Sequence, residues 1–66
     1  MSYTLTIQNF PNNTVEFREF TNIAAALQAM TERCDALGYE VTPDNEGNFT
    51  AGGIGHDWRI ELNSNF

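Results

Sequence analysis

Residues 21–37 read TNIAAALQAMTERCDAL, and this stretch decides the fold because its hydrophobic period differs from that of its surroundings. Its apolar side chains recur at alternating steps of four and three residues, which places them on one stripe of an α-helix. They are Ile23, Leu27, Met30, Cys34 and Leu37. The side chain of Thr21 or Asn22 can cap the first turn, and Gly38 can end the helix in a left-handed conformation.

Two stretches before this helix alternate apolar and polar residues, a pattern typical of a strand with one buried face. They are residues 3–8 (YTLTIQ) and residues 14–18 (TVEFR), and a loop rich in Asn and Pro joins them. The sequence therefore predicts a β-hairpin. Its buried face is expected to combine the apolar residues of both strands, which are Tyr3, Leu5, Ile7, Val15 and Phe17.

Three further short strands are predicted after the helix, at residues 39–42, 48–51 and 56–62, with turns at 43–47 and 52–55. The last residues, 63–66, are expected to fray. The order of elements is ββαβββ. The simplest layered arrangement is an α+β fold in which one helix packs on one face of a small antiparallel sheet, as a single domain over residues 1–66.

The chain carries nine acidic residues and three basic ones, all arginine, which gives a net charge of -6 over 66 residues. Like charges repel one another in the compact state, so this excess indicates either a solubility device or a surface complementary to a basic partner. Direct binding of nucleic acid is disfavoured because it depends on clustered Lys and Arg. No apolar run approaches the ~20 residues that span a bilayer, and no secretory leader is evident, so we expect a cytoplasmic protein without a membrane partner.

Residues capable of catalysis or metal binding are sparse. One cysteine, Cys34, and one histidine, His56, cannot build a structural zinc site, and Cys34 on the helical stripe is expected to be a buried small hydrophobe. Because neighbours on a strand point to opposite faces, His56 and Asp57 are not expected to act as a catalytic pair. The glycines of residues 52–55 precede a strand rather than a helix, which indicates a turn and not a phosphate loop. We therefore predict no enzymatic activity, no metal and no cofactor.

The same alternation predicts which side chains face solvent on the side of the sheet away from the helix. Four carboxylates are expected there: Glu16, Glu40, Asp57 and Glu61. Residues two apart on a strand are separated by roughly 6–7 Å. Asp57, Arg59 and Glu61 would thus form a charged ladder with a spacing comparable to that of backbone phosphates. The alternative is that the strands simply need a polar outer face.

Two further acidic regions are candidate partner-binding sites. One is the turn that contains Asp44 and Glu46, whose spacing does not fit a calcium loop and instead indicates a hairpin turn. The other is the outer surface of the helix, with Glu32 and Asp35. A solvated, non-binding surface is the alternative in both regions.

Small size, strong acidity, the absence of lysine and a minimal sheet-and-helix plan together resemble the small phage-encoded anti-CRISPR proteins that act as DNA mimics. The resemblance covers the whole chain as a profile and has no diagnostic motif, so no functional residue is transferred by position. It implies a stoichiometric inhibitor in the bacterial host cell. Such an inhibitor would be a monomer or weak dimer bound to a basic DNA-binding protein or to a subunit of a CRISPR effector complex, for which type I is the favoured class.

The alternative function is a small protein-interaction or regulatory module whose acidity serves solubility alone. Such a module would use an apolar patch around Phe10, Phe20 or Phe66 to dimerise or to bind a protein. The response to salt separates the two hypotheses. Binding by charge mimicry weakens steeply as ionic strength rises, whereas an apolar interface barely responds.

Overall fold

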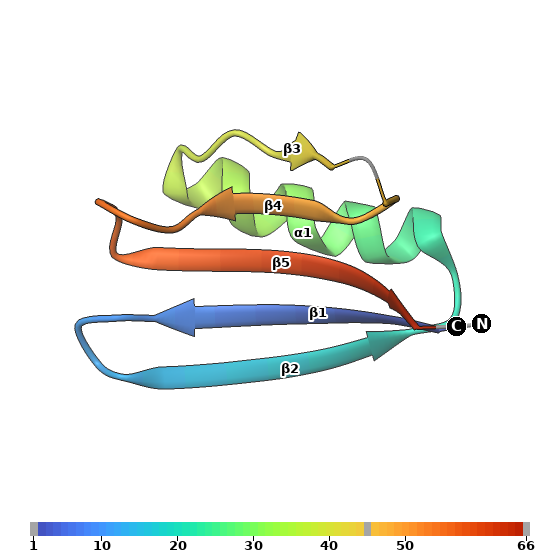
Figure 1. The fold of residues 1–66 in the computed structure, drawn as a ribbon, viewed down its shortest axis with the longest axis horizontal. Coiled ribbons are helices and arrows are strands. Elements are labelled where there is room, and N and C mark those ends of the chain that lie inside the picture. The colour runs from blue at the N-terminus through green and yellow to red at the C-terminus, as the bar shows by residue number, and fades with distance from the viewer. Residues whose placement is uncertain (1, 45, 66) are drawn as a thin grey trace.

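The computed structural model describes residues 2–44 and 46–65. It shows an α+β fold in which one helix packs against a five-stranded antiparallel sheet (Figure 1). The elements in chain order are β1 (Ser2–Asn9), β2 (Thr14–Phe20), α1 (Ile23–Leu37), β3 (Thr42–Pro43), β4 (Phe49–Gly52) and β5 (Trp58–Asn65). The predicted fold class and the order ββαβββ are therefore confirmed.

The two longest strands, β1 and β5, lie at the centre of the sheet, whose strand order is β2-β1-β5-β4-β3. β5 pairs with β1 along its whole length, so Ser2 near the start of the chain lies beside Asn65 near its end. The two strands run side by side at the centre of the sheet (Figure 1). The expected fraying of the tail is therefore wrong for residues 63–65, because β1 holds them by pairing. Phe66 lies outside the described residues.

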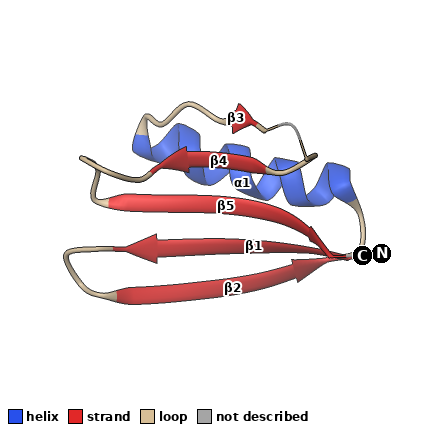
Figure 2. Ribbon diagram, viewed as in Figure 1, coloured by secondary structure: helices blue, strands red, loops and turns tan. Residues whose placement is uncertain are grey.

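Helix α1 lies on one face of the sheet, and local chemistry sets its ends (Figure 2). Oδ1 of Asn22 accepts hydrogen bonds from the backbone N–H groups of Ala24 at 2.8 Å and Ala25 at 3.2 Å. Gly38 follows the last turn with a φ of 76°, a left-handed conformation that glycine adopts without strain. Both predicted caps are confirmed. Within the described residues, no helix has the length and apolar character that a membrane span requires.

The core lies between α1 and the central strands. Its buried apolar side chains are Leu5, Ile7, Ala26, Met30, Cys34, Ala51, Ile60 and Leu62. The predicted helical stripe is confirmed at Met30 and Cys34, with Leu27 and Leu37 packed at the margin of the core. Ile23 is an exception: as the first residue of the helix it remains 37% exposed, since the helix meets the sheet from Ala26 onward.

The segment after the helix is less regular than the sequence pattern suggests. Only Thr42–Pro43 pairs as a strand, and residues 39–41 have no strand structure. Tyr39 and Val41 still pack against the core, as the alternation predicts. Glu40 lies between them and is exposed, but it is not part of a strand or of a sheet face.

The predicted buried face of the hairpin is wrong for its second strand. The loop between the paired residues of β1 and β2 contains residues 10–13, and the resulting register places Phe17 opposite Thr6 and Val15 opposite Gln8. Residues that pair across antiparallel strands point to the same face. Val15 and Phe17 therefore lie on the face of the sheet that points away from the helix, which we call the open face. They are 48% and 68% exposed there.

The side of β2 that faces the helix carries charged residues instead. Glu16 pairs with Ile7 and Arg18 pairs with Leu5, so both charged side chains share a face with the core residues of β1. A change of one residue in the register of a strand exchanges its two faces. The alternation in β2 is therefore real, but its register reverses the expected orientation.

Candidate functional site

The centre of the open face is neutralised by an ion pair. Arg59 and Glu61, two residues apart on β5, form a salt bridge through Nη2 and Oε1. Thr6 of β1 and Thr50 of β4 pair with Glu61 from its two sides. The predicted charged ladder is thus present at Arg59 and Glu61, but its carboxylate is compensated within the chain.

The four carboxylates expected on the open face are not brought together. Only Glu61 lies on this face within a strand. Asp57 precedes β5, and its backbone carbonyl accepts a hydrogen bond from the N–H of Phe10 at 2.9 Å. Glu40 lies in the irregular segment after α1, and Glu16 lies on the helix side of β2. Strand boundaries and register cause this separation, because alternation alone specifies neither.

Glu16 contributes to a small cluster on the helix side of the sheet. Its Oε2 lies 3.8 Å from Nη2 of Arg33 in α1. The guanidinium of Arg33 also lies over the ring of Trp58, with Cζ 5.9 Å from the ring centroid. Arg33 is therefore directed toward β2 and β5, and it forms no ion pair within 4.0 Å with Glu32 or Asp35, which lie close to it on the helix.

Those neighbours form the first part of an acidic surface. Glu32 and Asp35 are exposed on α1, and Oε1 of Glu32 accepts a hydrogen bond from Nε2 of Gln28 at 3.4 Å. Glu40 is exposed shortly after the helix ends. The aligned peptide dipoles of a helix make the potential at its C-terminus negative even before the carboxylates are counted.

In the turn before β4, the carboxylate of Asp44 stabilises the backbone of the turn. Oδ1 of Asp44 accepts hydrogen bonds from the backbone N–H groups of Asn48 at 2.9 Å and Glu46 at 2.8 Å. These two bonds, with that from Asn48 the stronger influence, hold the pKa of Asp44 below its usual range. The predicted hairpin turn is confirmed, and Glu46 is exposed on it. Asn45 lies outside the described residues.

Most carboxylates of the described chain lack a cationic partner. Of the nine acidic residues, seven have no arginine within 4.0 Å. They are Glu19, Glu32, Asp35, Glu40, Asp44, Glu46 and Asp57, and all are exposed. Five of them belong to α1, the segment after it and the turn before β4. We call these five exposed carboxylates together the acidic side: Glu32, Asp35, Glu40, Asp44 and Glu46.

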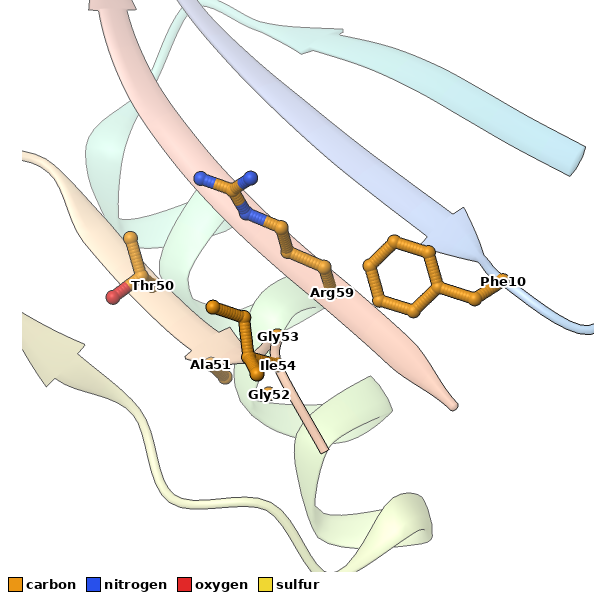
Figure 3. Close-up of a pocket in the computed structure, with 7 residues that line it drawn as sticks. All are labelled: Phe10, Thr50, Ala51, Gly52, Gly53, Ile54 and Arg59. Atoms are coloured by element: carbon orange, nitrogen blue, oxygen red, sulfur yellow. The ribbon is translucent and has the colours of Figure 1, made fainter. Parts of the chain in front are cut away.

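A hollow of about 330 Å³ opens on the open face beside the end of β4 (Figure 3). The side chains of Phe10, Ile54 and Arg59 border it, and Ile54 is fully exposed. The backbone here approaches β5 closely, since a Cβ on Gly52 would lie 2.1 Å from the carbonyl oxygen of Trp58. No pattern in the sequence indicates this hollow, because Phe10 comes from the distant hairpin loop.

The turn at residues 52–55 leads into β5, as predicted, and does not meet a helix N-terminus. His56, which precedes β5, lies against Tyr39 with the ring centroids 4.9 Å apart. Cys34 is buried as predicted, and this burial raises the pKa of its thiol. In the part of the chain that the structure describes, no group of three or more His, Cys, Asp or Glu side chains could hold a metal ion.

Comparison with protein-family models, curated proteins and solved structures finds no match to this chain. A function can therefore be inferred only from the surface of the protein. Two regions differ from an ordinary polar surface: the acidic side, with its uncompensated carboxylates, and the margin of the open face at β2, with exposed Val15 and Phe17.

Proposed function

We propose that this protein is a non-enzymatic inhibitor that binds a basic, nucleic-acid-binding surface of a bacterial defence complex through its acidic side. The resemblance of the sequence profile to DNA-mimicking anti-CRISPR proteins favours a CRISPR effector complex of type I as the partner. The observation that carries the proposal is the set of seven exposed carboxylates without an arginine partner, five of which belong to the acidic side.

Carboxylates on such a surface can replace DNA phosphates in a channel lined by lysine and arginine. An arginine of the partner can donate two parallel hydrogen bonds to one carboxylate, which makes the contact both strong and specific. Uncompensated charge also speeds the encounter of oppositely charged surfaces. The open face is less suited to this role, because Glu61 is paired with Arg59 and apolar side chains interrupt the face at β2.

A competition assay tests the proposal. A purified type I effector complex is loaded with fluorescent target DNA, and the protein is added at increasing concentration. We expect release of the DNA, with an inhibition that weakens steeply between about 50 and 200 mM salt because the contact is electrostatic. Capture of a basic protein from bacterial lysate at low but not high salt would identify a partner of the same class.

Two matched variants locate the interface. Both remove four negative charges, but Asp44 is retained because its carboxylate closes a turn. The acidic-side variant is Glu32→Gln, Asp35→Asn, Glu40→Gln and Glu46→Gln. The control variant is Glu16→Gln, Glu19→Gln, Asp57→Asn and Glu61→Gln. We expect the first to lose inhibition and the second to keep most of it. Equal inhibition by both would exclude the acidic side, and no effect on any type I complex together with no salt-sensitive capture would refute the function.

A second candidate function is favoured by a different observation. Phe17 is 68% exposed and Val15 is 48% exposed on the open face, while Phe10 borders the nearby hollow. These side chains suit a protein-interaction module that uses an apolar patch. Of the other residues expected in such a patch, Phe20 packs against the core and Phe66 lies outside the described residues. Partner binding that persists at high salt and is lost in Phe17→Ser would favour this function.

A further inference from the structure

Strand β2 forms one edge of the sheet and has β1 as its single neighbour. All of its residues except Phe20 are exposed, and it contains neither glycine nor proline. No other element lies beyond this strand in Figure 1. An edge strand of this kind presents unpaired backbone N–H and C=O groups to which another strand can add.

The opposite edge of the sheet is closed to such pairing. There, β3 consists of Thr42–Pro43 alone, and proline has no N–H to donate. Short edge strands and edge prolines are common means by which proteins prevent strand addition. One edge of this sheet is therefore protected, whereas the other is long and regular.

We propose that a second copy of this chain pairs with β2, with the two β2 strands antiparallel about a two-fold axis at Phe17. In this register Phe17 lies opposite Phe17 of the second copy. Glu16 of each copy lies opposite Arg18 of the other, so one geometry creates two ion pairs by symmetry. This association uses residues outside the acidic side and does not depend on the proposed function.

The chemistry of β2 supports this register. Glu16 and Arg18 share the helix side of the strand, and opposite charges directly across antiparallel strands stabilise their pairing. Phe17 lies on the open face with most of its ring exposed, and pairing it with its own copy buries both rings as an aromatic pair. At the outer positions Val15 lies opposite Glu19, which brings no like charges together.

Neighbouring registers are disfavoured by the same charges. A shift of two residues in one direction places Glu16 opposite Glu16 of the second copy, and a shift in the other direction places Arg18 opposite Arg18. Arg18 forms no ion pair among the described residues; its Cζ lies 5.5 Å from the ring centroid of Phe20. Because β3 blocks the other edge, assembly stops at a closed two-fold dimer.

Sedimentation equilibrium of the full chain at protein concentrations up to about 1 mM tests the proposal, since it detects a dimer with a Kd as weak as about 1 mM. Glu16→Arg and Arg18→Glu each place like charges opposite one another, and we expect each to raise the dimer Kd about tenfold. The exchanged double variant, Glu16→Arg with Arg18→Glu, restores opposite charges and should recover most of the affinity. Glu19→Arg changes the charge as much as Glu16→Arg but should have little effect, since it lies opposite Val15.

Cross-linking tests the register independently. Phe17→Cys places two thiols opposite each other, and oxidised glutathione should convert it into a covalent dimer far faster than Val15→Cys, whose thiol lies opposite residue 19. The native Cys34 is buried and should not interfere. A chain that stays monomeric up to about 1 mM overturns the proposal. So does a dimer that is insensitive to the β2 charges, or one that cross-links equally at both positions.

Discussion

Strands β2 and β5 carry the same alternation of apolar and polar residues, yet they have opposite roles. In β5, Ile60 and Leu62 point toward α1 and are fully buried. In β2, Val15 and Phe17 point away from α1 and are largely exposed. β5 has a neighbouring strand on each side, whereas β2 is an edge. Alternation therefore specifies that a strand has an apolar face, and the pairing register determines whether that face is buried.

This difference in burial assigns the two strands different roles: β5 contributes to stability, and β2 is available for recognition. Truncation of an apolar residue in β5 should remove core packing, while the same change in β2 should leave the fold almost intact. β5 is also held by backbone contacts from β4, whereas β2 keeps one side free for another strand. Substitutions in the two strands and in the turns beside them test this division.

The strongest contrast is between Leu62→Ala and Phe17→Ala. Leu62 is fully buried, so its truncation should lower the free energy of unfolding by about 3 kcal/mol through lost burial and a residual cavity. Phe17 is exposed, so its truncation should change stability by no more than about 0.5 kcal/mol. Urea denaturation followed by circular dichroism, at a concentration too low for association, measures both. Similar losses in the two variants would contradict the assigned register.

The next effect concerns the backbone that supports the start of β5. An alanine at Gly52 would place its Cβ 2.1 Å from the carbonyl oxygen of Trp58, at a φ of 73°. We expect Gly52→Ala to cost about 2 kcal/mol of stability. Gly53→Ala is the control, because its φ is also positive but nothing lies within 4 Å of the added methyl group. Thermal melts should show the larger decrease for Gly52→Ala, and a reversed order would show that the close approach is not required.

Smaller effects are expected from the ion pairs on the two strands. Double-mutant cycles to alanine for Arg59 with Glu61, and for Arg33 with Glu16, should each give a coupling below about 1 kcal/mol because the pairs are partly exposed. The Arg59–Glu61 coupling should be the larger, since the Glu61 side chain is 25% exposed and that of Glu16 is 54% exposed. A strong coupling between Arg33 and Glu16 would mean that β2 contributes more to stability than its exposure indicates.

The smallest effect lies in the turn before β4, away from both strands. The pKa of Asp44 is lowered in the folded state, so its carboxylate stabilises the fold fully above the ordinary aspartate pKa. That contribution is lost as the pH falls below the ordinary aspartate pKa of about 3.9 and through the lowered one. Asp44→Asn should therefore flatten the dependence of Tm on pH in this window. Parallel Tm profiles for the two proteins would show that the charge of Asp44 does not stabilise the turn.

Local signals in the sequence predicted the helix and the turns well. The N-cap at Asn22, the left-handed end at Gly38 and the stripe through Met30 and Cys34 all depend on residues a few positions apart. The hairpin turn at Asp44 is local in the same way. Tertiary packing does not change such features, because the interactions that define them join residues only a few positions apart.

The candidate sites were predictable only where they depend on one element. Exposure of Glu32 and Asp35 follows from the helical period, and the structure agrees. The open-face cluster failed because it combined residues from several strands, and Glu16 and Glu40 lie elsewhere. Placement on a shared face requires the correct register for every strand, and a one-residue error in any of them moves a side chain to the opposite face.

Patterns in the sequence alone are enough to predict the acidity of the chain, its α+β class, the ends of its helix and an apolar face on each long strand. Other features are visible only in the folded chain: β1 and β5 are central, Phe17 faces away from the helix and Arg33 turns toward Glu16. The first set depends on short-range chemistry. The second depends on pairing between distant segments, where loop length fixes the register and the register selects the exposed face.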